Sequence, residues 1–180
     1  MPSGKIIFFV VGLIFYSVKS SAQVSSNFSS SDESWTVIDN FTNTTPIYNA
    51  SGGNTGGYIS YTAPLSNTNV YFVSPSKFSG NFSASYNQSI SFDLKVSATG
   101  TDAVPSFGDV VIFSPSATLV HQLPSNPVTG AWTSYSFVLN ETQGWHNGCY
   151  TCSAPSQTQM KQALQNITKI QIRLKYATIT

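Results

Sequence analysis

The sequence predicts an all-β fold, either a two-layered sandwich or a barrel, with one short α-helix. Apolar and polar residues alternate over short stretches, most clearly from Ile90 to Val96 and from Ile170 to Tyr176. This alternation is the pattern of a half-buried strand. Clusters of Gly, Pro, Ser and Asn separate the stretches and are typical of turns. Short strands at this spacing favour a sandwich or barrel over alternating strands and helices.

The predicted strands follow one another from residue 34 onward. They cover residues 34–41, 56–63, 69–75, 89–97, 109–115, 117–123, 133–139 and 170–176. Residues 109–115 are nearly all apolar, which predicts a central strand buried on both faces. The polar stretch around Gly80, Asn81 and Asn87 lies between two strands, and we interpret it as the wet edge of a sheet rather than a functional loop.

One helix interrupts the strands. Ser156 is followed three residues later by Gln159, which is a capping-box pattern directly after Pro155. The apolar residues that follow recur at i, i+3, i+4 and i+7, which places them on one face of a helix: Met160, Ala163, Leu164 and Ile167. We expect a single short amphipathic helix lying on the sandwich.

The N-terminus has the pattern of a secretory signal peptide. Lys5 precedes an apolar run from Ile6 to Tyr16, and small residues at 20–22 provide a cleavage site after Ala22. The run is too short to span a bilayer as a helix, which takes about 20 residues; an uncleaved anchor is the alternative. We therefore divide the chain into a signal peptide (1–22), a polar leader (23–34) and one sandwich domain (35–180), and expect a secreted, extracellular protein.

The charge balance excludes some partners. The whole chain has eight Lys and Arg against seven Asp and Glu. Removal of Lys5 and Lys19 with the signal leaves six basic groups, a net charge of −1. Six dispersed cations are too few for a nucleic-acid-binding surface or for attachment to an anionic membrane. We expect no nucleic-acid partner and no membrane insertion after signal cleavage.

Eight Asn-X-Ser/Thr sequons follow the signal segment, none with proline in the middle position. They lie at Asn27, Asn40, Asn43, Asn49, Asn81, Asn87, Asn140 and Asn166. In a eukaryotic host we expect several of them to carry glycans, which would also compensate for the low charge.

Cys149 and Cys152 are the only cysteines. In an exported protein they favour a short-loop disulfide. A zinc site would need two further ligands, for which His121 and His146 are the only histidines. Pairing with a second chain is the remaining alternative.

The sequence contains no recognisable catalytic motif, and we predict that the protein is not an enzyme. His121 lies in a strand-like segment and His146 in a loop, and neither has a catalytic neighbour at a known spacing. We expect no cofactor. A structural calcium ion is compatible with the carboxylates Asp32, Glu33, Asp39, Asp102 and Asp109, but their spacing assigns no ligands.

Aromatic residues are plentiful and mostly occupy strand positions, which predicts that they fill the core. Trp145 differs, because it lies in the loop sequence QGWHNG. We expect this ring to be exposed, and it is the candidate ligand contact.

The order of these segments resembles the laminin B domain, also called laminin domain IV type A. The first matching group is Tyr71, Phe72, Pro75, Lys77, Phe78, Gly80, Ser85, Tyr86, Ser91, Phe92 and Leu94. The second is Met160, Leu164, Ile167, Thr168, Ile170, Ile172 and Arg173. The resemblance covers about residues 35–176.

The resemblance implies a jelly-roll-like β-sandwich that serves as a non-catalytic extracellular module with a structural or adhesive role in a matrix. The implied partners are extracellular proteins or glycans, and a carbohydrate-binding module is the alternative function. Members of the family commonly continue into one more segment, whereas this chain stops at Thr180. Either the last strand is missing or another segment covers that edge.

Overall fold

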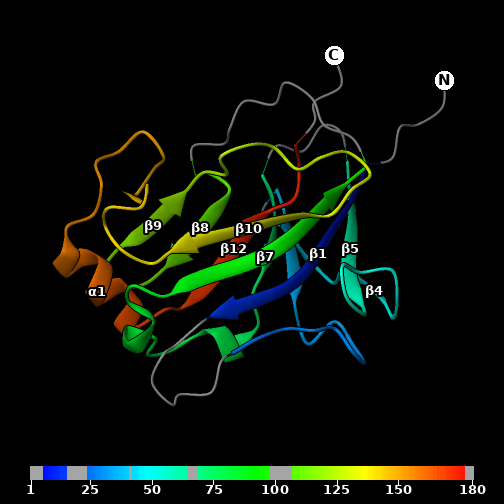
Figure 1. The fold of residues 1–180 in the computed structure, drawn as a ribbon, viewed down its shortest axis with the longest axis horizontal. Coiled ribbons are helices and arrows are strands. Elements are labelled where there is room, and N and C mark those ends of the chain that lie inside the picture. Colours follow the sequence, from blue (N-terminus) through cyan, green and yellow to red (C-terminus); the bar gives the residue numbers. More distant parts are fainter. Residues whose placement is uncertain (1–5, 16–23, 41, 65–68, 98–106, 177–180) are drawn as a thin grey trace.

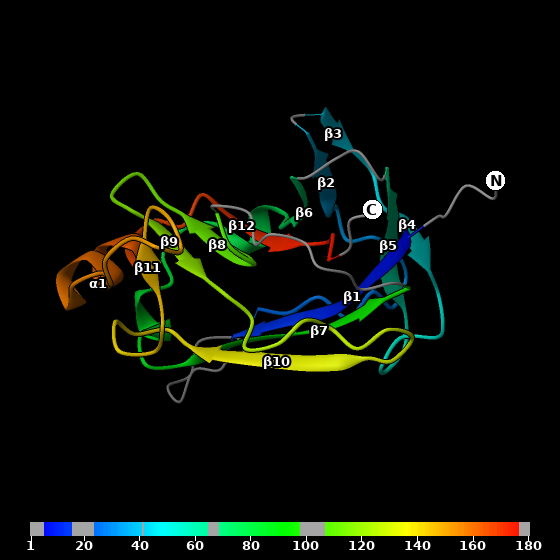
Figure 2. The ribbon, with the colours of Figure 1, turned by 90° about the horizontal axis from the view of Figure 1, so that it is seen from above.

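Two antiparallel sheets face each other and enclose the hydrophobic core (Figure 1). The computed structural model describes residues 6–15, 24–40, 42–64, 69–97 and 107–176, and every structural statement concerns these residues. Figure 2 shows the sheets as two layers, with the helix at one end. The predicted all-β sandwich with one short helix is confirmed.

The first sheet has five strands. Their spatial order is β10 (Thr133–Val138), β7 (Ser89–Val96), β1 (Ile6–Phe15), β5 (Tyr58–Ala63) and β4 (Ile47–Asn49). The pattern of burial along β7 matches its sequence pattern, since its four apolar side chains are at most 2% exposed and point inward: Ile90, Phe92, Leu94 and Val96.

The second sheet has seven strands. Their order is β11 (His146–Asn147), β9 (Thr118–His121), β8 (Val110–Phe113), β12 (Lys169–Arg173), β6 (Val70–Val73), β2 (Thr36–Asp39) and β3 (Thr42–Thr44). The nearly all-apolar β8 lies between β9 and β12, and Val110, Val111 and Ile112 are fully buried. The sequence prediction of a central strand buried on both faces is therefore confirmed for β8.

Strand β1 differs from the sequence-based picture. It lies inside the segment predicted to be a signal peptide, yet in the full chain it pairs antiparallel with both β5 and β7. Val10, for example, lies opposite Ile59 of β5 and Leu94 of β7. The signal peptide stays a prediction. In the uncleaved chain, the structure places residues 6–15 as a strand between β5 and β7.

The polar stretch between β6 and β7 forms two short 3₁₀ helices, η1 (Ser76–Phe78) and η2 (Ser83–Ser85). Gly80 exchanges both backbone hydrogen bonds with Ile167, at 2.7 and 2.9 Å. Phe78 is fully buried. The stretch is thus a packed turn that ties β6 to the end of the helix.

Helix α1 (Gln157–Gln165) begins as predicted. The Ser156 hydroxyl accepts from the Gln159 backbone N–H at 3.2 Å, and the Gln159 side chain accepts from the Ser156 N–H at 2.8 Å. Met160, Ala163 and Leu164 are buried. The capping box therefore satisfies two backbone donors that a helix N-terminus leaves unpaired.

Ser156→Ala should lower the free energy of unfolding by about 1 kcal/mol, because one of these two donors loses its acceptor. Urea denaturation followed by circular dichroism would measure the loss. Ser153→Ala is the matched control, since Ser153 is exposed just before the helix and should leave stability unchanged. Equal effects of the two substitutions would contradict the role of the cap.

Candidate functional site

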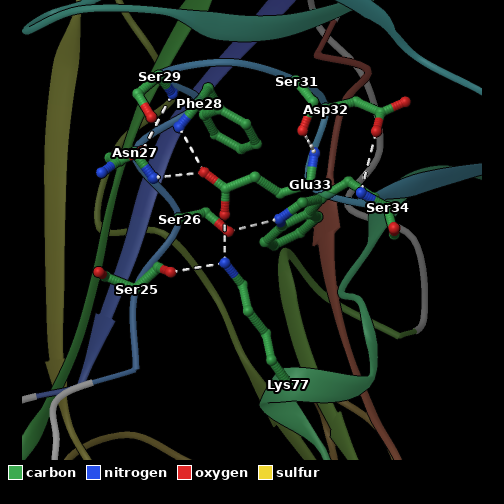
Figure 3. Close-up of polar contacts among 11 residues, drawn as sticks. Ser25, Ser26, Asn27, Phe28, Ser29, Ser31, Asp32, Glu33, Ser34 and Lys77 are labelled. Atoms are coloured by element: carbon green, nitrogen blue, oxygen red, sulfur yellow. Dashed lines mark hydrogen bonds and ion pairs between the residues drawn. The ribbon is translucent and has the colours of Figure 1, made fainter.

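A network of polar contacts surrounds Glu33 at the end of the predicted polar leader (Figure 3). One carboxylate oxygen of Glu33 accepts from the backbone N–H groups of Asn27 and Phe28, at 3.0 and 2.7 Å. The other pairs with the Lys77 ammonium, which also donates to the Ser25 carbonyl at 2.7 Å. We call Ser25, Asn27, Phe28, Glu33 and Lys77 the Glu33 cluster.

Local turns bring these groups together. The Asn27 side chain accepts from the Ser29 N–H at 3.0 Å, and Asp32 accepts from the Ser34 N–H at 2.9 Å. Phe28 and Glu33 have positive φ angles of 49° and 51°, in the left-handed region that non-glycine residues seldom adopt. The leader is thus folded tightly back on itself.

The cluster fixes an aromatic contact beneath it. Trp35 packs against Phe28 and Phe78 at ring-centroid distances of 6.2 and 5.7 Å, and all three rings are at most 1% exposed. The Trp35 indole N–H donates to the Ser26 hydroxyl at 2.8 Å. The leader therefore belongs to the folded domain, and sequence reasoning had not identified this.

Glu33 serves as an anchor. Partial burial alone would raise its pKa, but the hydrogen bonds from Lys77 and from the Phe28 N–H outweigh it and hold the pKa below its usual value. Because both oxygens are engaged by donors of the protein itself, the carboxylate is poorly suited to act as a general base toward a substrate.

A second cluster lies at the edge of the sandwich, between β9 and β10. The His121 ring contacts Phe137 at 4.2 Å and Trp145 at 5.0 Å between ring centroids. Its Nδ1 faces the Gln122 carbonyl at 2.6 Å and its Nε2 the Gln143 carbonyl at 2.8 Å. The cleft beside it measures about 360 Å³. With both ring nitrogens facing backbone carbonyls, His121 is a packing residue in this geometry.

Trp145 lies behind this cleft and corrects a sequence expectation. Its ring is fully buried, and its indole N–H donates to the Val138 carbonyl at 2.9 Å. The prediction of an exposed ring was wrong, because the loop turns the indole inward against His121. Trp145 is therefore not available to stack on a ligand.

The cysteines pair with each other. Cys149 and Cys152 form a disulfide with a Cα–Cα distance of 5.1 Å, as predicted. His146 Nδ1 faces the Cys152 carbonyl at 2.6 Å, so this histidine packs against the disulfide loop.

The carboxylates considered for calcium occupy separate places. Asp39 accepts from the Tyr61 hydroxyl at 2.6 Å. Asp109 is 4% exposed, lies 3.3 Å from Arg173 and accepts from the Leu123 N–H at 2.8 Å. Asp102 lies outside the described residues. Among the residues that the structure describes, no three His, Cys, Asp or Glu side chains group as metal ligands.

The sequon asparagines all lie in the described part of the chain. Asn49 and Asn140 are half-buried. The other six are exposed, namely Asn27, Asn40, Asn43, Asn81, Asn87 and Asn166. Exposure is what attachment of a bulky glycan requires. Within the described residues, no helix is long and apolar enough to cross a membrane.

The family model for Laminin B (Domain IV) matches residues 71–180. The chain belongs to the laminin B (domain IV) family. The laminin gamma-2 subunits of Equus caballus and Homo sapiens are each 36% identical over an alignment of 114 residues, and the match covers 59% of this chain and 9% of theirs. The chain thus spans less than a tenth of these relatives.

A solved structure supports the fold. The L4b domain of human laminin alpha-2 superimposes with a TM-score of 0.52 at 18% identity. The match covers 62% of this chain and 63% of that one. At this identity the likeness concerns the fold alone.

Glu33→Ala should release the leader, because two backbone donors lose this acceptor and the Lys77 ammonium loses its ion-pair partner. We expect the free energy of unfolding to fall by about 1 kcal/mol, the value of a partly exposed charged hydrogen bond. Hydrogen exchange measured by mass spectrometry should accelerate in residues 24–34. Glu141→Ala, which removes a carboxylate that accepts from the Tyr86 hydroxyl, should leave that exchange unchanged. Unaltered exchange in Glu33→Ala would refute the anchor.

His121 should make stability depend on pH. Burial lowers its pKa, and the two carbonyls offset this only in part. As the pH falls from about 7.5 to about 5.5, the unfolded chain takes up the proton first, so the free energy of unfolding decreases.

Urea denaturation across that range would measure this decrease, and His121→Gln should flatten it. Glu33→Gln is the control and should keep it, since the lowered pKa of Glu33 keeps the titration of that carboxyl below this pH range. An equal slope in His121→Gln would show that another group is responsible.

Proposed function

We propose that this chain is a secreted, non-catalytic extracellular module with a structural or adhesive role in a matrix. The observation that carries the proposal is the match to the laminin B (domain IV) family over residues 71–180. The N-terminal export pattern and the six exposed sequon asparagines support an extracellular, glycosylated protein.

The geometry of the described residues supports a structural role. The two histidines face backbone carbonyls, and Glu33 and Asp109 are held by the protein's own donors. These groups hold the fold together. Partners of the module would therefore be bound by its exposed surface, as extracellular proteins or glycans. The carbohydrate-binding alternative is weakened, because Trp145, the ring expected to stack on a sugar, is buried.

Retention on extracellular matrix tests the proposal. The tagged precursor is expressed in eukaryotic cells, and the protein from the medium is applied to decellularised matrix. We expect it to be retained more than a tagged secreted protein of unrelated fold. Retention should survive enzymatic removal of its own N-glycans, because the folded surface makes the contacts.

Each result has a distinct meaning. Retention abolished by free sugars would favour the carbohydrate-binding alternative. Retention equal to that of the unrelated protein would reject the adhesive role. Protein that stays inside the cell would reject export.

A further inference from the structure

The central position of the five-stranded sheet is held by a segment that export would remove. β1 is the only element between β5 and β7 in that described sheet, and it pairs antiparallel with each (Figure 1). Its register runs from Ile6 opposite Ala63 on one side to Phe15 opposite Ile90 on the other. The whole strand lies within residues 1–22, the predicted signal peptide.

Removal of β1 would leave a row of backbone donors and acceptors on β5 and on β7. Buried backbone groups of this kind are paired in nearly all folded proteins, so the empty position would be costly. The facing apolar side chains include Ile59 and Leu94, which are at most 1% exposed. The position therefore calls for another strand with an apolar sequence.

Side-chain contacts link the β5 side of this position to the β7 side. The Asn54 side chain, in the loop before β5, donates to Asp93 of β7 at 3.2 Å. The Trp132 indole, just before β10, donates to the Gly52 carbonyl at 3.2 Å and meets the Tyr58 ring of β5 at 5.7 Å. These links span the position of β1 and favour a separation of two strand spacings, about 10 Å.

We propose that the position between β5 and β7 is a strand-binding site of the exported protein, filled by an extended apolar segment of a second polypeptide. This inference rests on the proposed export, which removes Ile6–Phe15. The bound segment runs antiparallel to both neighbours, as β1 does. Backbone hydrogen bonds on two sides provide the affinity, and the apolar side chains select the segment.

The described strands within residues 24–176 already have other places in the two sheets, which favours a second chain as the source. Moving one of them would break its own pairing. A donor strand within a longer form of the same chain is the competing arrangement, and the experiment below separates the two.

Disulfide trapping tests the site and its register. The protein is purified from the medium as secreted, and its mass shows whether residues 1–22 have been removed. The probe is a synthetic peptide of residues 6–15 with a lysine at each end for solubility and Phe9→Cys.

In β1, Phe9 lies opposite Lys95, whereas Ser91 lies opposite Ile14. Opposed strand positions are close enough for a disulfide, and positions four residues away are about 13 Å distant.

Secreted Lys95→Cys should therefore trap this peptide about tenfold more than secreted Ser91→Cys, because the bound strand holds the two thiols at high effective concentration. A peptide with Ile14→Cys should reverse that preference. Val10→Pro in either peptide should abolish trapping, since proline cannot take a central strand position.

Two other outcomes would overturn the proposal. Equal trapping or none in correctly cleaved protein would mean that the position is closed or filled by the protein's own chain, and the matrix role would be untouched. A mass that retains Ile6–Phe15 would overturn the signal assignment and with it the need for a donor.

Discussion

A strand in the middle of a sheet must be hydrogen-bonded on both sides, and this constraint shapes the five-stranded layer. β5 and β7 each have one side facing the central position, so the pairing of the layer depends on whatever strand lies there. In the full chain that strand is β1, the most apolar stretch of the sequence. The proposed export would therefore compete with folding for the same residues.

The opposite layer does not contain β1. Its strands β8 and β12 place buried side chains on consecutive positions, and the rings of Phe28, Trp35 and Phe78 close one end of the core. The Glu33 cluster holds the leader over these rings. Because burial of large aromatic side chains stabilises a core strongly, the leader contributes to the domain although its own sequence is polar.

The sequence predicted the parts of the fold that local patterns encode. Alternation identified β7, and the capping box identified α1, because both patterns report which face of an element is buried. Alternation also located β12, but the expected half-burial of that strand was wrong, since Gln171 and Arg173 are buried as well. The contact between Glu33 and Lys77 joins residues 44 positions apart, and no local pattern encodes such a pair. Trp145 shows the same limit, since a polar loop sequence does not reveal that its ring points inward. The short strands β3, β4 and β11 have too few residues to show alternation.

The residues that carry the family likeness are mostly interior ones. Phe72 and Phe78 are fully buried, Phe92 and Leu94 nearly so, and Gly80 makes the turn that reaches the helix end. Such positions are constrained by packing, so similarity at them transmits the sandwich. Binding to a partner depends instead on exposed positions, where relatives at 36% identity have the most freedom to differ. The surface of this chain, with its exposed sequons and its strand-binding position, is therefore where its own partners must be sought.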